Sequence, residues 1–312
     1  MNNNYDVIIV GTGAAGLFAG LCLPADLKVL MITKDKVENS DSYLAQGGIC
    51  TLKSADDFDA FYQDTLKAGR NENNPESVKI MIQQAPQIMK DLMDYGVEFD
   101  RDTEGNLAYT REGAHSEYRI LHHQDVTGKE ITSKLIKQVE MRNNITMVED
   151  ATMLDIINHD NIATGIVMEN NGEIIQINAK VIILATGGIG GLFTHSSNFR
   201  HITGDSFAIA LRNNIELENI NYIQIHPTTL YTTKPGRSFL ISEGAHLLNP
   251  DMERFVDELL PRDVVSNAIK KEMDKYNVPH VYLSVTHMDP KQIKRRFPHI
   301  YDQCLAEGYD MF

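Results

Sequence analysis

Three glycines near the N-terminus have the spacing of a phosphate-binding loop. Gly11, Gly13 and Gly16 form a GxGxxG motif directly after a short apolar run at residues 5–10 and before a predicted helix. The first glycine permits a tight turn, the second lets the backbone approach a pyrophosphate, and the third lets helix and strand pack closely. Backbone N–H groups at the start of a helix favour an anion. The motif therefore predicts that this segment binds a dinucleotide.

The residue expected to bind the ribose is not acidic. In NAD-binding folds an Asp or Glu ends the second strand about 20 residues after the glycines. Here the second predicted strand, residues 27–33, is followed by Lys34, and the nearest acid is Asp35. A cationic Lys34 would instead cover the ribose edge or the phosphates. This departure disfavours an NAD-dependent dehydrogenase and is compatible with FAD as the dinucleotide.

The elements around the loop predict an α/β fold. Residues 5–10 and 27–33 have the pattern of buried strands, with a helix at 14–23 between them. Short strands recur over residues 145–186, where Asn170-Asn171-Gly172 is typical of a hairpin turn. We therefore predict a doubly wound, Rossmann-like domain with an inserted antiparallel β meander.

The other periodic segments are helical. Apolar residues at helical spacing predict a helix from Val78 to Leu92, ended by Gly96. Two more helices are predicted at 263–276 and 290–308. The pattern becomes mixed near residue 220, so we predict a cofactor domain at 1–220 and a mixed α+β capping domain at 221–312.

Composition and charge disfavour several functions. The 312 residues include 29 Lys plus Arg against 43 Asp plus Glu, a net charge of −14. Such a surface repels nucleic acids and anionic membranes. Three widely spaced cysteines without a CxxC motif predict a reducing compartment, and we expect a cytoplasmic protein without a metal site. Residues 7–25 carry no charge, but four glycines and the lack of a preceding basic residue predict strand, turn and helix rather than a membrane span.

Further motifs resemble the succinate dehydrogenase/fumarate reductase flavoprotein family. Residues 42–49 (SYLAQGGI) are similar to the flavin-contacting segment of its aspartate oxidase branch. The other matches follow in family order: TREGAHS at 110–116, DVTG at 125–128, ATGG at 185–188, GD at 204–205, IHPT at 225–228 and LPRD at 260–263. Together the matches cover nearly the whole chain.

The resemblance implies that the cofactor is FAD. The residues implied to contact it are Gly11, Thr12, Gly13, Ala14, Ala15, Gly16, Lys34, Asp41, Ser42, Tyr43, Leu44, Ala45, Gln46, Gly47, Gly48, Ala185, Thr186, Gly187 and Asp205. Respiratory members attach FAD covalently to a histidine just upstream of residues 42–49. Here the first histidine of the chain is His115, and Asp41 stands roughly at the matching place. FAD is therefore expected to be non-covalent, which favours the aspartate oxidase branch.

The resemblance also implies a site for L-aspartate. The two substrate carboxylates need donors, for which His226 and Arg262 are suited, and the ammonium needs an acceptor. The resemblance implies that Arg262 is the proton donor and acceptor. An arginine has a pKa above about 12 and rarely gives up its proton, so the alternative is that Arg262 acts as an electrostatic clamp on the substrate. Glu112 is implied to orient the ammonium, which succinate lacks. Ser242 and Glu243 resemble a substrate-contacting pair, in a segment several residues shorter than the family's.

The expected function is thus FAD-dependent oxidation of L-aspartate to iminoaspartate, the first step of NAD biosynthesis. Dioxygen or fumarate would accept the electrons, and quinolinate synthase would consume the product. A fumarate reductase or succinate dehydrogenase-type flavoprotein is one alternative. An inactive FAD-binding fragment is another, because the sequence ends at Phe312, where the family continues with further flavin- and substrate-binding segments.

Overall fold

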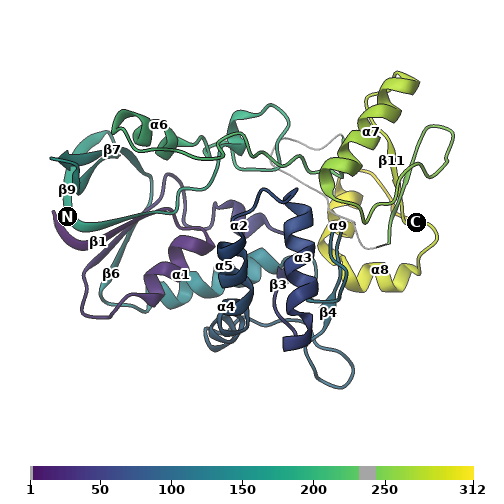
Figure 1. The fold of residues 1–312 in the computed structure, drawn as a ribbon, viewed down its shortest axis with the longest axis horizontal. Helices are drawn as coiled ribbons and strands as arrows, with labels where there is room; N and C mark the ends of the chain where they lie inside the picture. Colours follow the sequence, from purple (N-terminus) through teal and green to yellow (C-terminus); the bar gives the residue numbers. More distant parts are fainter. Residues whose placement is uncertain (1–2, 232–243) are drawn as a thin grey trace. The chain divides into compact units, whose positions relative to one another are not determined.

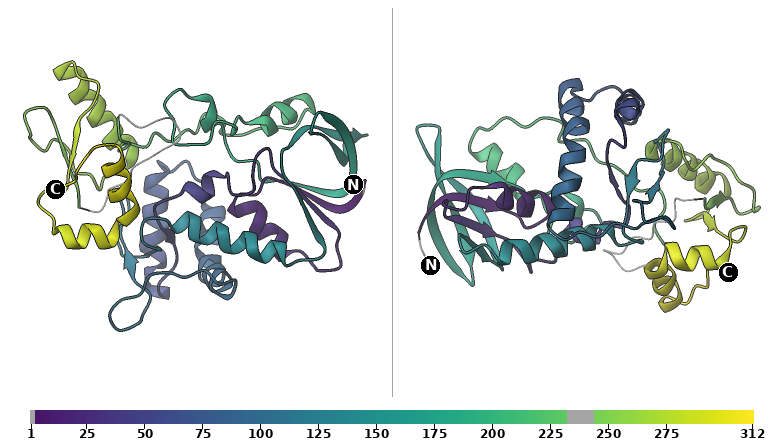
Figure 2. Two further views of the ribbon diagram at one scale, coloured as in Figure 1. Left: turned by 180° about the vertical axis from the view of Figure 1, so that it is seen from behind. Right: turned by 90° about the horizontal axis from the view of Figure 1, so that it is seen from below.

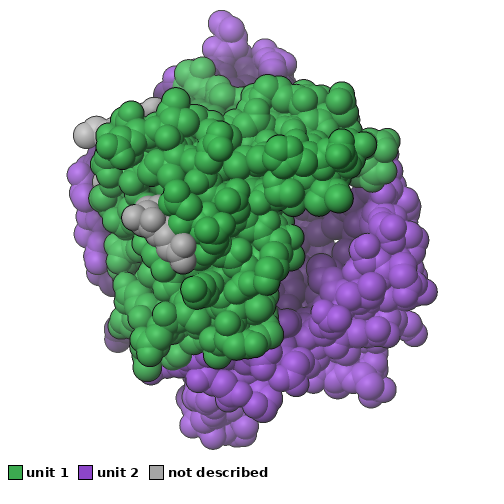
Figure 3. Space-filling model, turned by 90° about the vertical axis from the view of Figure 1, so that its left-hand side faces the viewer, with its two compact units in different colours: residues 1–45, 128–222 green, residues 46–127, 223–312 purple. Residues whose placement is uncertain are grey.

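A computed structural model describes residues 3–231 and 244–312, which belong to two compact units. Unit 1 comprises residues 1–45 and 128–222, and unit 2 comprises residues 46–127 and 223–312 (Figure 3). The junction at 222 lies next to the predicted boundary at 220, but the predicted division did not separate residues 46–127. No linker-like composition marks either end of that stretch, so the sequence gives no local signal for it.

Unit 1 is built on one six-stranded mixed sheet, which confirms the predicted α/β class. The strand order is β6-β2-β1-β9-β8-β7, with parallel pairing from β6 to β9 and antiparallel pairing from β9 to β7. Figure 1 labels most of these strands, and Figure 2 shows the sheet from two further sides. The strands are β1 (Asn4–Val10), β2 (Val29–Ile32), β6 (Ile145–Val148), β7 (Ala151–His159), β8 (Ile162–Asn170) and β9 (Glu173–Leu184).

Strand β9 joins the parallel and antiparallel parts of the sheet. Its first half pairs with β8 up to Asn178, and its second half pairs with β1 from Asn178 to Leu184. The sequence pattern predicted only short strands over residues 145–186. The structure has one continuous strand of 12 residues instead. The β-branched content persists without a turn residue, so nothing interrupts the extended backbone.

The predicted hairpin turn between β8 and β9 is confirmed. Asn170 pairs with Glu173, which leaves a two-residue loop of Asn171 and Gly172. Both loop residues have positive φ, 54° and 83°. This is the requirement of a type I′ turn, which Asn-Gly meets at little cost.

Both faces of the central strands are buried. Helix α1 (Ala14–Cys22) packs on one face, where Gly20 lies so close to Met31 and Ile9 that a Cβ on it would sit 3.3 and 3.5 Å from their side chains. The opposite face packs against the β7–β9 meander and against Ile209 of α6 (Asp205–Arg212). The residues of this second face include Ile8, Val10, Leu30, Ile32, Met153, Ile166, Met168 and Ile177. Burial on two faces explains why β1 and β2 are continuous apolar runs.

Unit 2 contains two small antiparallel sheets and several helices. The sheets have the orders β3-β5-β4 and β10-β11. The predicted helix after residue 78 is α4, which begins at Pro75 behind an Asn74 cap and ends before Gly96, whose φ is 92°. The elements of this unit are β3 (Ile49–Cys50), α3 (Phe58–Ala68), α4 (Pro75–Asp94), β4 (Tyr109–Thr110), β5 (Ile120–Leu121), β10 (His246–Leu248), α7 (Arg262–Tyr276), β11 (Tyr282–Ser284), α8 (Pro290–Arg296) and α9 (Pro298–Ala306).

The C-terminal helix predicted at 290–308 is two helices. They are separated at Phe297, which has φ −128° and ψ 52°. Pro298 follows, and a proline disfavours helical backbone at the residue before it. The other described helices are the short α2 (Asp41–Leu44) in unit 1 and the 14-residue α5 (Thr127–Glu140), whose first residue is the last of unit 2 before the chain returns to unit 1. Short 3-10 turns lie at Ala55–Asp57 and Gly190–Leu192. Among the described residues, no helix is long and apolar enough to cross a membrane.

Candidate functional site

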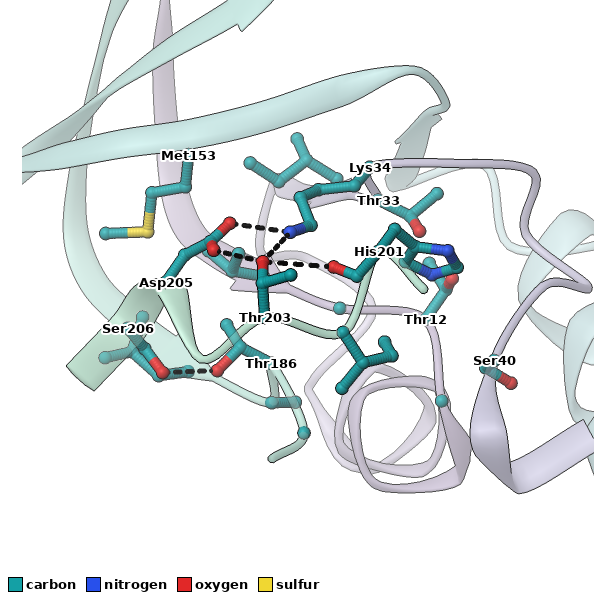
Figure 4. A pocket seen from close by; sticks show the side chains of 18 of the residues that line it. Thr12, Thr33, Lys34, Ser40, Met153, Thr186, His201, Thr203, Asp205 and Ser206 are labelled. Atoms are coloured by element: carbon teal, nitrogen blue, oxygen red, sulfur yellow. Dashed lines mark hydrogen bonds and ion pairs between the residues drawn. The ribbon is translucent and has the colours of Figure 1, made fainter. Parts of the chain in front are cut away.

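Unit 1 contains a cavity of about 410 Å³ at the carboxyl ends of its parallel strands. Val10, Ile32 and Leu184, which end β1, β2 and β9, line it together with Met153 and Ile209. In open α/β sheets, ligands bind at these strand ends where neighbouring connections diverge. The cavity therefore combines an apolar wall with the polar loops that follow the strands (Figure 4).

The glycine motif forms one edge of this cavity and leaves no room for side chains. Gly11 has φ +110°, and a Cβ on it would lie 2.2 Å from the carbonyl oxygen of Ala185. A Cβ on Gly16 would lie 2.0 Å from the Gly11 carbonyl oxygen. The backbone N–H of Ala14, in the first turn of α1, donates to Ser42 Oγ at 3.0 Å. The loop thus presents backbone atoms next to a helix N-terminus, an arrangement that favours binding of an anion.

Lys34 lies in the cavity wall and pairs with Asp205 (Figure 4). Its Nζ is 2.7 Å from Asp205 Oδ2 and donates to Thr203 Oγ1 at 2.9 Å. Thr203 Oγ1 donates to the other carboxylate oxygen at 2.6 Å. Burial raises the pKa of the Asp205 carboxyl, but the hydrogen bonds from Lys34 and Thr203 outweigh it and hold that pKa below its usual value. The result is a charged, fixed triad where the ribose-binding acid of NAD enzymes would stand.

Most of the predicted cofactor residues of unit 1 line this cavity. They are Gly11, Thr12, Gly13, Ala15, Lys34, Asp41, Ser42, Ala185, Thr186, Gly187 and Asp205. The remaining predicted residues of the unit do not. Ala14 and Gly16 belong to the glycine loop described above. Tyr43 has the ammonium of Lys129 over its ring, 6.0 Å from the centroid. Leu44 is exposed, and Ala45 packs against Gly128.

Asp41 has a positioning role in the cavity wall. Its Oδ2 accepts from Asn198 Nδ2 at 2.6 Å, and its Oδ1 accepts from the Phe199 backbone N–H at 2.9 Å. These bonds hold the start of α2 to the loop before α6. The two bonds therefore fix the orientation of the Asp41 carboxylate in the cavity wall.

Unit 2 brings three predicted substrate residues together around a small cavity of about 50 Å³. Glu112, His226 and Arg262 all line it, although they are far apart in the sequence. Leu247, Leu260, Val265 and Leu283 supply an apolar part of the wall. The predicted residues Ser242 and Glu243 lie outside the described residues. The three predicted residues therefore supply a carboxylate, an imidazole and a guanidinium to this cavity, above an apolar base.

His226 is a neutral hydrogen-bonding group. Burial, with a smaller effect of the Arg262 charge, lowers the pKa of His226 to about 4. The Thr228 backbone N–H donates to Nδ1 at 3.3 Å, so the ring proton sits on Nε2. Near pH 7 this residue can donate one N–H from Nε2, but it does not contribute a positive charge.

Arg262 begins α7 and supplies the positive charge of this cavity. Its Nη1 donates to Gln224 Oε1 at 2.8 Å, and no carboxylate of the described residues is ion-paired with it. Its neighbour Asp263 pairs with Arg70 instead, and that hydrogen bond lowers the pKa of the Asp263 carboxyl. The guanidinium therefore retains charge and N–H groups for an anionic ligand.

The flavin-motif residues of unit 2 lie beside Glu112. A Cβ on Gly47 would be 3.0 Å from Glu112 Oε1, and one on Gly48 would be 2.4 Å from the Leu121 carbonyl oxygen. Gln46 Oε1 is buried without a hydrogen-bond partner among the described residues. The segment is thus tightly held at its glycines and keeps an unsatisfied acceptor.

The structure adds residues that the sequence did not single out. Glu258 lines the second cavity, where its Oε1 accepts from the Leu247 backbone N–H at 2.6 Å and its Oε2 accepts from Arg254 at 2.6 Å. Thr203, Ser206 and Met153 line the first cavity. Glu258 stands two residues before the LPRD motif, and this proximity is the only feature of the sequence that could have pointed to a place in the site. Nothing local distinguished the other three.

Comparison with known proteins identifies relatives of the whole chain. The sequence matches the FAD binding domain family over residues 6–310. It is 47% identical to L-aspartate oxidase of Clostridium perfringens, covering 100% of this chain and 72% of the relative. It is 48% identical to L-aspartate oxidase of Clostridium acetobutylicum, covering 100% of this chain and 73% of the relative.

Two solved structures align with nearly the whole chain. The FrdA chain of E. coli quinol fumarate reductase aligns with a TM-score of 0.89 at 28% identity, covering 98% of this chain and 57% of that chain. The Sdh1 complex of Mycobacterium smegmatis aligns with a TM-score of 0.82 at 30% identity, covering 99% of this chain and 57% of that chain. This chain therefore spans somewhat more than half the length of those proteins.

Proposed function

The chain belongs to the FAD-binding domain family and, within it, to the L-aspartate oxidases, and from this premise we propose that it oxidises L-aspartate to iminoaspartate. One observation carries the proposal: Glu112, His226 and Arg262 line a single cavity. An acceptor for an ammonium, a neutral N–H donor and a cation are the groups that an amino dicarboxylate requires.

FAD is the cofactor, and the residues of unit 1 fit it. Any side chain on Gly11 or Gly16 would collide with backbone, as expected of a loop that a pyrophosphate approaches closely. The cavity wall formed by Val10, Ile32 and Leu184 suits an apolar ring system, and Lys34 in the same wall would supply a cation for the ribose or the phosphates. When bound, FAD accepts the two electrons and the hydrogen lost from the substrate carbon.

Substrate recognition is divided among the three groups of the second cavity. Glu112 accepts hydrogen bonds from the α-ammonium, and Arg262 pairs with a carboxylate. His226 adds an uncharged N–H from Nε2, because Thr228 occupies Nδ1 and the low pKa keeps the ring neutral. A neutral donor avoids repulsion of Arg262 and still holds a carboxylate oxygen.

Arg262 is also the group that we assign to proton movement. It stands at the first residue of α7 with one N–H on Gln224, so its position is fixed without neutralising its charge. Oxidation of the amine to the imine releases protons as well as the hydride, and the guanidinium is the group that we assign to this proton transfer. If it stays charged throughout, it acts as an electrostatic clamp on the substrate.

Glu112 separates this proposal from a fumarate reductase-type activity, which remains the alternative. Succinate has no ammonium, so a carboxylate beside Gly47 repels a plain dicarboxylate and attracts an amino acid. The electron acceptor is dioxygen or fumarate. The imine product hydrolyses in water, which supports an enzyme such as quinolinate synthase acting next. We place the protein in the cytoplasm, since its described cysteines, Cys22, Cys50 and Cys304, form no disulfide.

Anaerobic reduction of the bound flavin tests the proposal. The chain is reconstituted with FAD, and the visible absorbance is followed after addition of L-aspartate, succinate or N-acetyl-L-aspartate. We expect L-aspartate alone to bleach the flavin, because both other compounds lack the ammonium. Bleaching by succinate alone would establish the respiratory-type alternative. Bound FAD that no compound bleaches would contradict catalysis and leave an FAD-holding fragment.

A further inference from the structure

A buried arginine of unit 2 lies beside the loop that carries Glu112, and the mechanism above does not use it. The side chain of Arg119 is 0% exposed. Its Nε and Nη2 donate to the two oxygens of Asp57 at 2.9 and 2.6 Å, and its Nη1 donates to Asp64 at 2.6 Å. A buried cation with two carboxylates is costly to desolvate and is weak evidence for stability alone. Its contacts therefore call for a specific role.

The same guanidinium fixes His115. Arg119 Nη1 lies 3.2 Å from His115 Nδ1, and an arginine N–H can only donate, so Nδ1 is the acceptor. Burial and the charge of Arg119 lower the pKa of His115, which keeps the ring neutral with its proton on Nε2. Nε2 lies 3.5 Å from Cys50 Sγ, three residues after Gly47. A continuous set of contacts thus joins Asp57 and Asp64 to the segment around Gly47.

The loop after β4 must reverse direction to bring Glu112 to Gly47. Strands β3 and β4 both pair antiparallel with β5, so they run in the same direction as each other. Cys50 and Thr110 both lie opposite Ile120. Gly47 precedes β3, whereas Glu112 follows β4. The two residues would therefore diverge if the chain continued straight.

The reversal is held by contacts rather than by backbone preference. Ala114 has φ +67°, a left-handed conformation that is unfavourable for a non-glycine residue. The His115 N–H donates to the Glu112 carbonyl at 3.3 Å, and the N–H and hydroxyl of Ser116 both donate to Asp64 Oδ2 at 2.7 Å. Asp64 is one of the two carboxylates that Arg119 holds. The arginine therefore anchors the loop at both His115 and Ser116.

We propose that Arg119 is a positioning residue for substrate recognition, which keeps residues 112–116 folded back so that the Glu112 carboxylate stays beside Gly47. The proposal rests on the proposed role of Glu112 in binding the ammonium. It follows that loss of the Arg119 contacts weakens L-aspartate binding and leaves the steps that do not involve the ammonium unchanged.

The first test is Arg119→Lys, which keeps the charge that neutralises Asp57 and Asp64 but not the forked donor geometry. We expect the KM for L-aspartate to rise about tenfold at a similar kcat, with the KM for fumarate reduction changed less than twofold. In the chain without cofactor, amide hydrogen exchange of residues 111–118 should become faster while the rest is unchanged. Arg142→Lys is the matched control, because Arg142 donates to the Leu23 carbonyl in unit 1.

A double variant decides whether Arg119 acts through Glu112. In a Glu112→Gln background, Arg119→Lys should add nothing to the KM for L-aspartate, since coupled residues are not additive. Additive losses, equal losses for fumarate, or unchanged exchange at 111–118 would overturn the proposal.

A second variant avoids leaving buried charges unpaired if Arg119→Lys does not fold. His115→Phe keeps a ring beside Phe61, where the centroids are 6.3 Å apart, and removes both ring-nitrogen contacts. The same KM increase and faster loop exchange are expected, and their absence counts against the proposal. If the unaltered protein does not oxidise L-aspartate, the proposed function fails. The exchange experiment still decides whether Arg119 holds the loop.

Discussion

Lys34 and Asp205 form an ion pair of 2.7 Å between residues 171 positions apart in the sequence. The pair joins the end of β2 to the first residue of α6 and lines the larger cavity. A cation therefore occupies the place of the usual ribose-binding acid, and its carboxylate partner lines the same cavity.

We expect Lys34→Met to weaken FAD binding about tenfold and to lower the Tm of the apo chain at pH 7, since a hydrogen bond to a charged group contributes about 1.5–3 kcal/mol. The pKa of Asp205 is held below its usual value, so this stability is present above the unfolded pKa of about 3.9 and is lost as the pH falls through the folded value. The Tm difference should shrink between pH 7 and pH 3. Lys36→Met is the control, because Lys36 pairs with Asp150 on the surface. A difference that is the same at both pH values would contradict the assignment.

Gly11→Ala should destabilise the apo chain by several kcal/mol and abolish FAD binding. The new Cβ would lie 2.2 Å from the Ala185 carbonyl oxygen, at a residue with φ +110°. Thermal melting and FAD titration measure the two effects. Gly188→Ala is the matched control for stability, because no atom lies within 4 Å of a Cβ there. Equal melting temperatures for the two variants would refute the close approach.

His226 should titrate far below an ordinary histidine. With its pKa lowered to about 4, the ring is neutral near pH 7. Its contribution to stability is full above the unfolded pKa of about 6.5 and is lost on acidification through about pH 4. Nitrogen-15 NMR of the imidazole, assigned with His226→Gln, measures both the titration and the Nε2–H tautomer. A midpoint near 6.5 would remove the argument for a neutral donor.

The donor role of His226 predicts a difference between two substitutions. His226→Gln keeps an N–H and should retain about a tenth of kcat/KM for L-aspartate, whereas His226→Leu should lose at least about a hundredfold. Steady-state kinetics at pH 7.5 tests this. Equal losses would mean that the ring acts by shape alone.

Glu112→Gln should raise the KM for L-aspartate at least about tenfold without weakening fumarate reduction, since only L-aspartate offers an ammonium and fumarate loses a repelling carboxylate. Gly47→Ala should act in the same direction, because its Cβ would lie 3.0 Å from Glu112 Oε1 and displace the carboxylate. Parallel losses with both substrates would indicate a general structural defect instead.

The local parts of the site could be predicted from the sequence. The strand, the GxGxxG turn and α1 follow from residues within one short segment, and the Asn171-Gly172 turn follows from two residues that tolerate positive φ. Glu112, His226 and Arg262 were recognised by motif resemblance. Their convergence on one cavity is a tertiary fact that no local pattern contains.

Ion pairs between residues that are distant in the sequence could not be predicted either, because no local pattern contains them. Nothing near Lys34 indicates Asp205, and nothing near Arg119 indicates Asp57 or Asp64. The placement of residues 46–127 with 223–312 also depends on contacts between distant segments. By contrast, the break between α8 and α9 was missed although Pro298 supplied a local signal.

The uninterrupted course of β9 links the hairpin turn to the cofactor loop. The turn at Asn171-Gly172 sets the pairing of β9 with β8, and the same strand ends one residue before Ala185, whose carbonyl abuts Gly11. A one-residue insertion at the turn that moved β9 along both β8 and β1 would reverse the direction of every following side chain. The length of the surface hairpin therefore helps to set the position of the flavin loop. We expect natural changes of its length to be tolerated only when the side chains of β9 still alternate between the same two faces of the sheet.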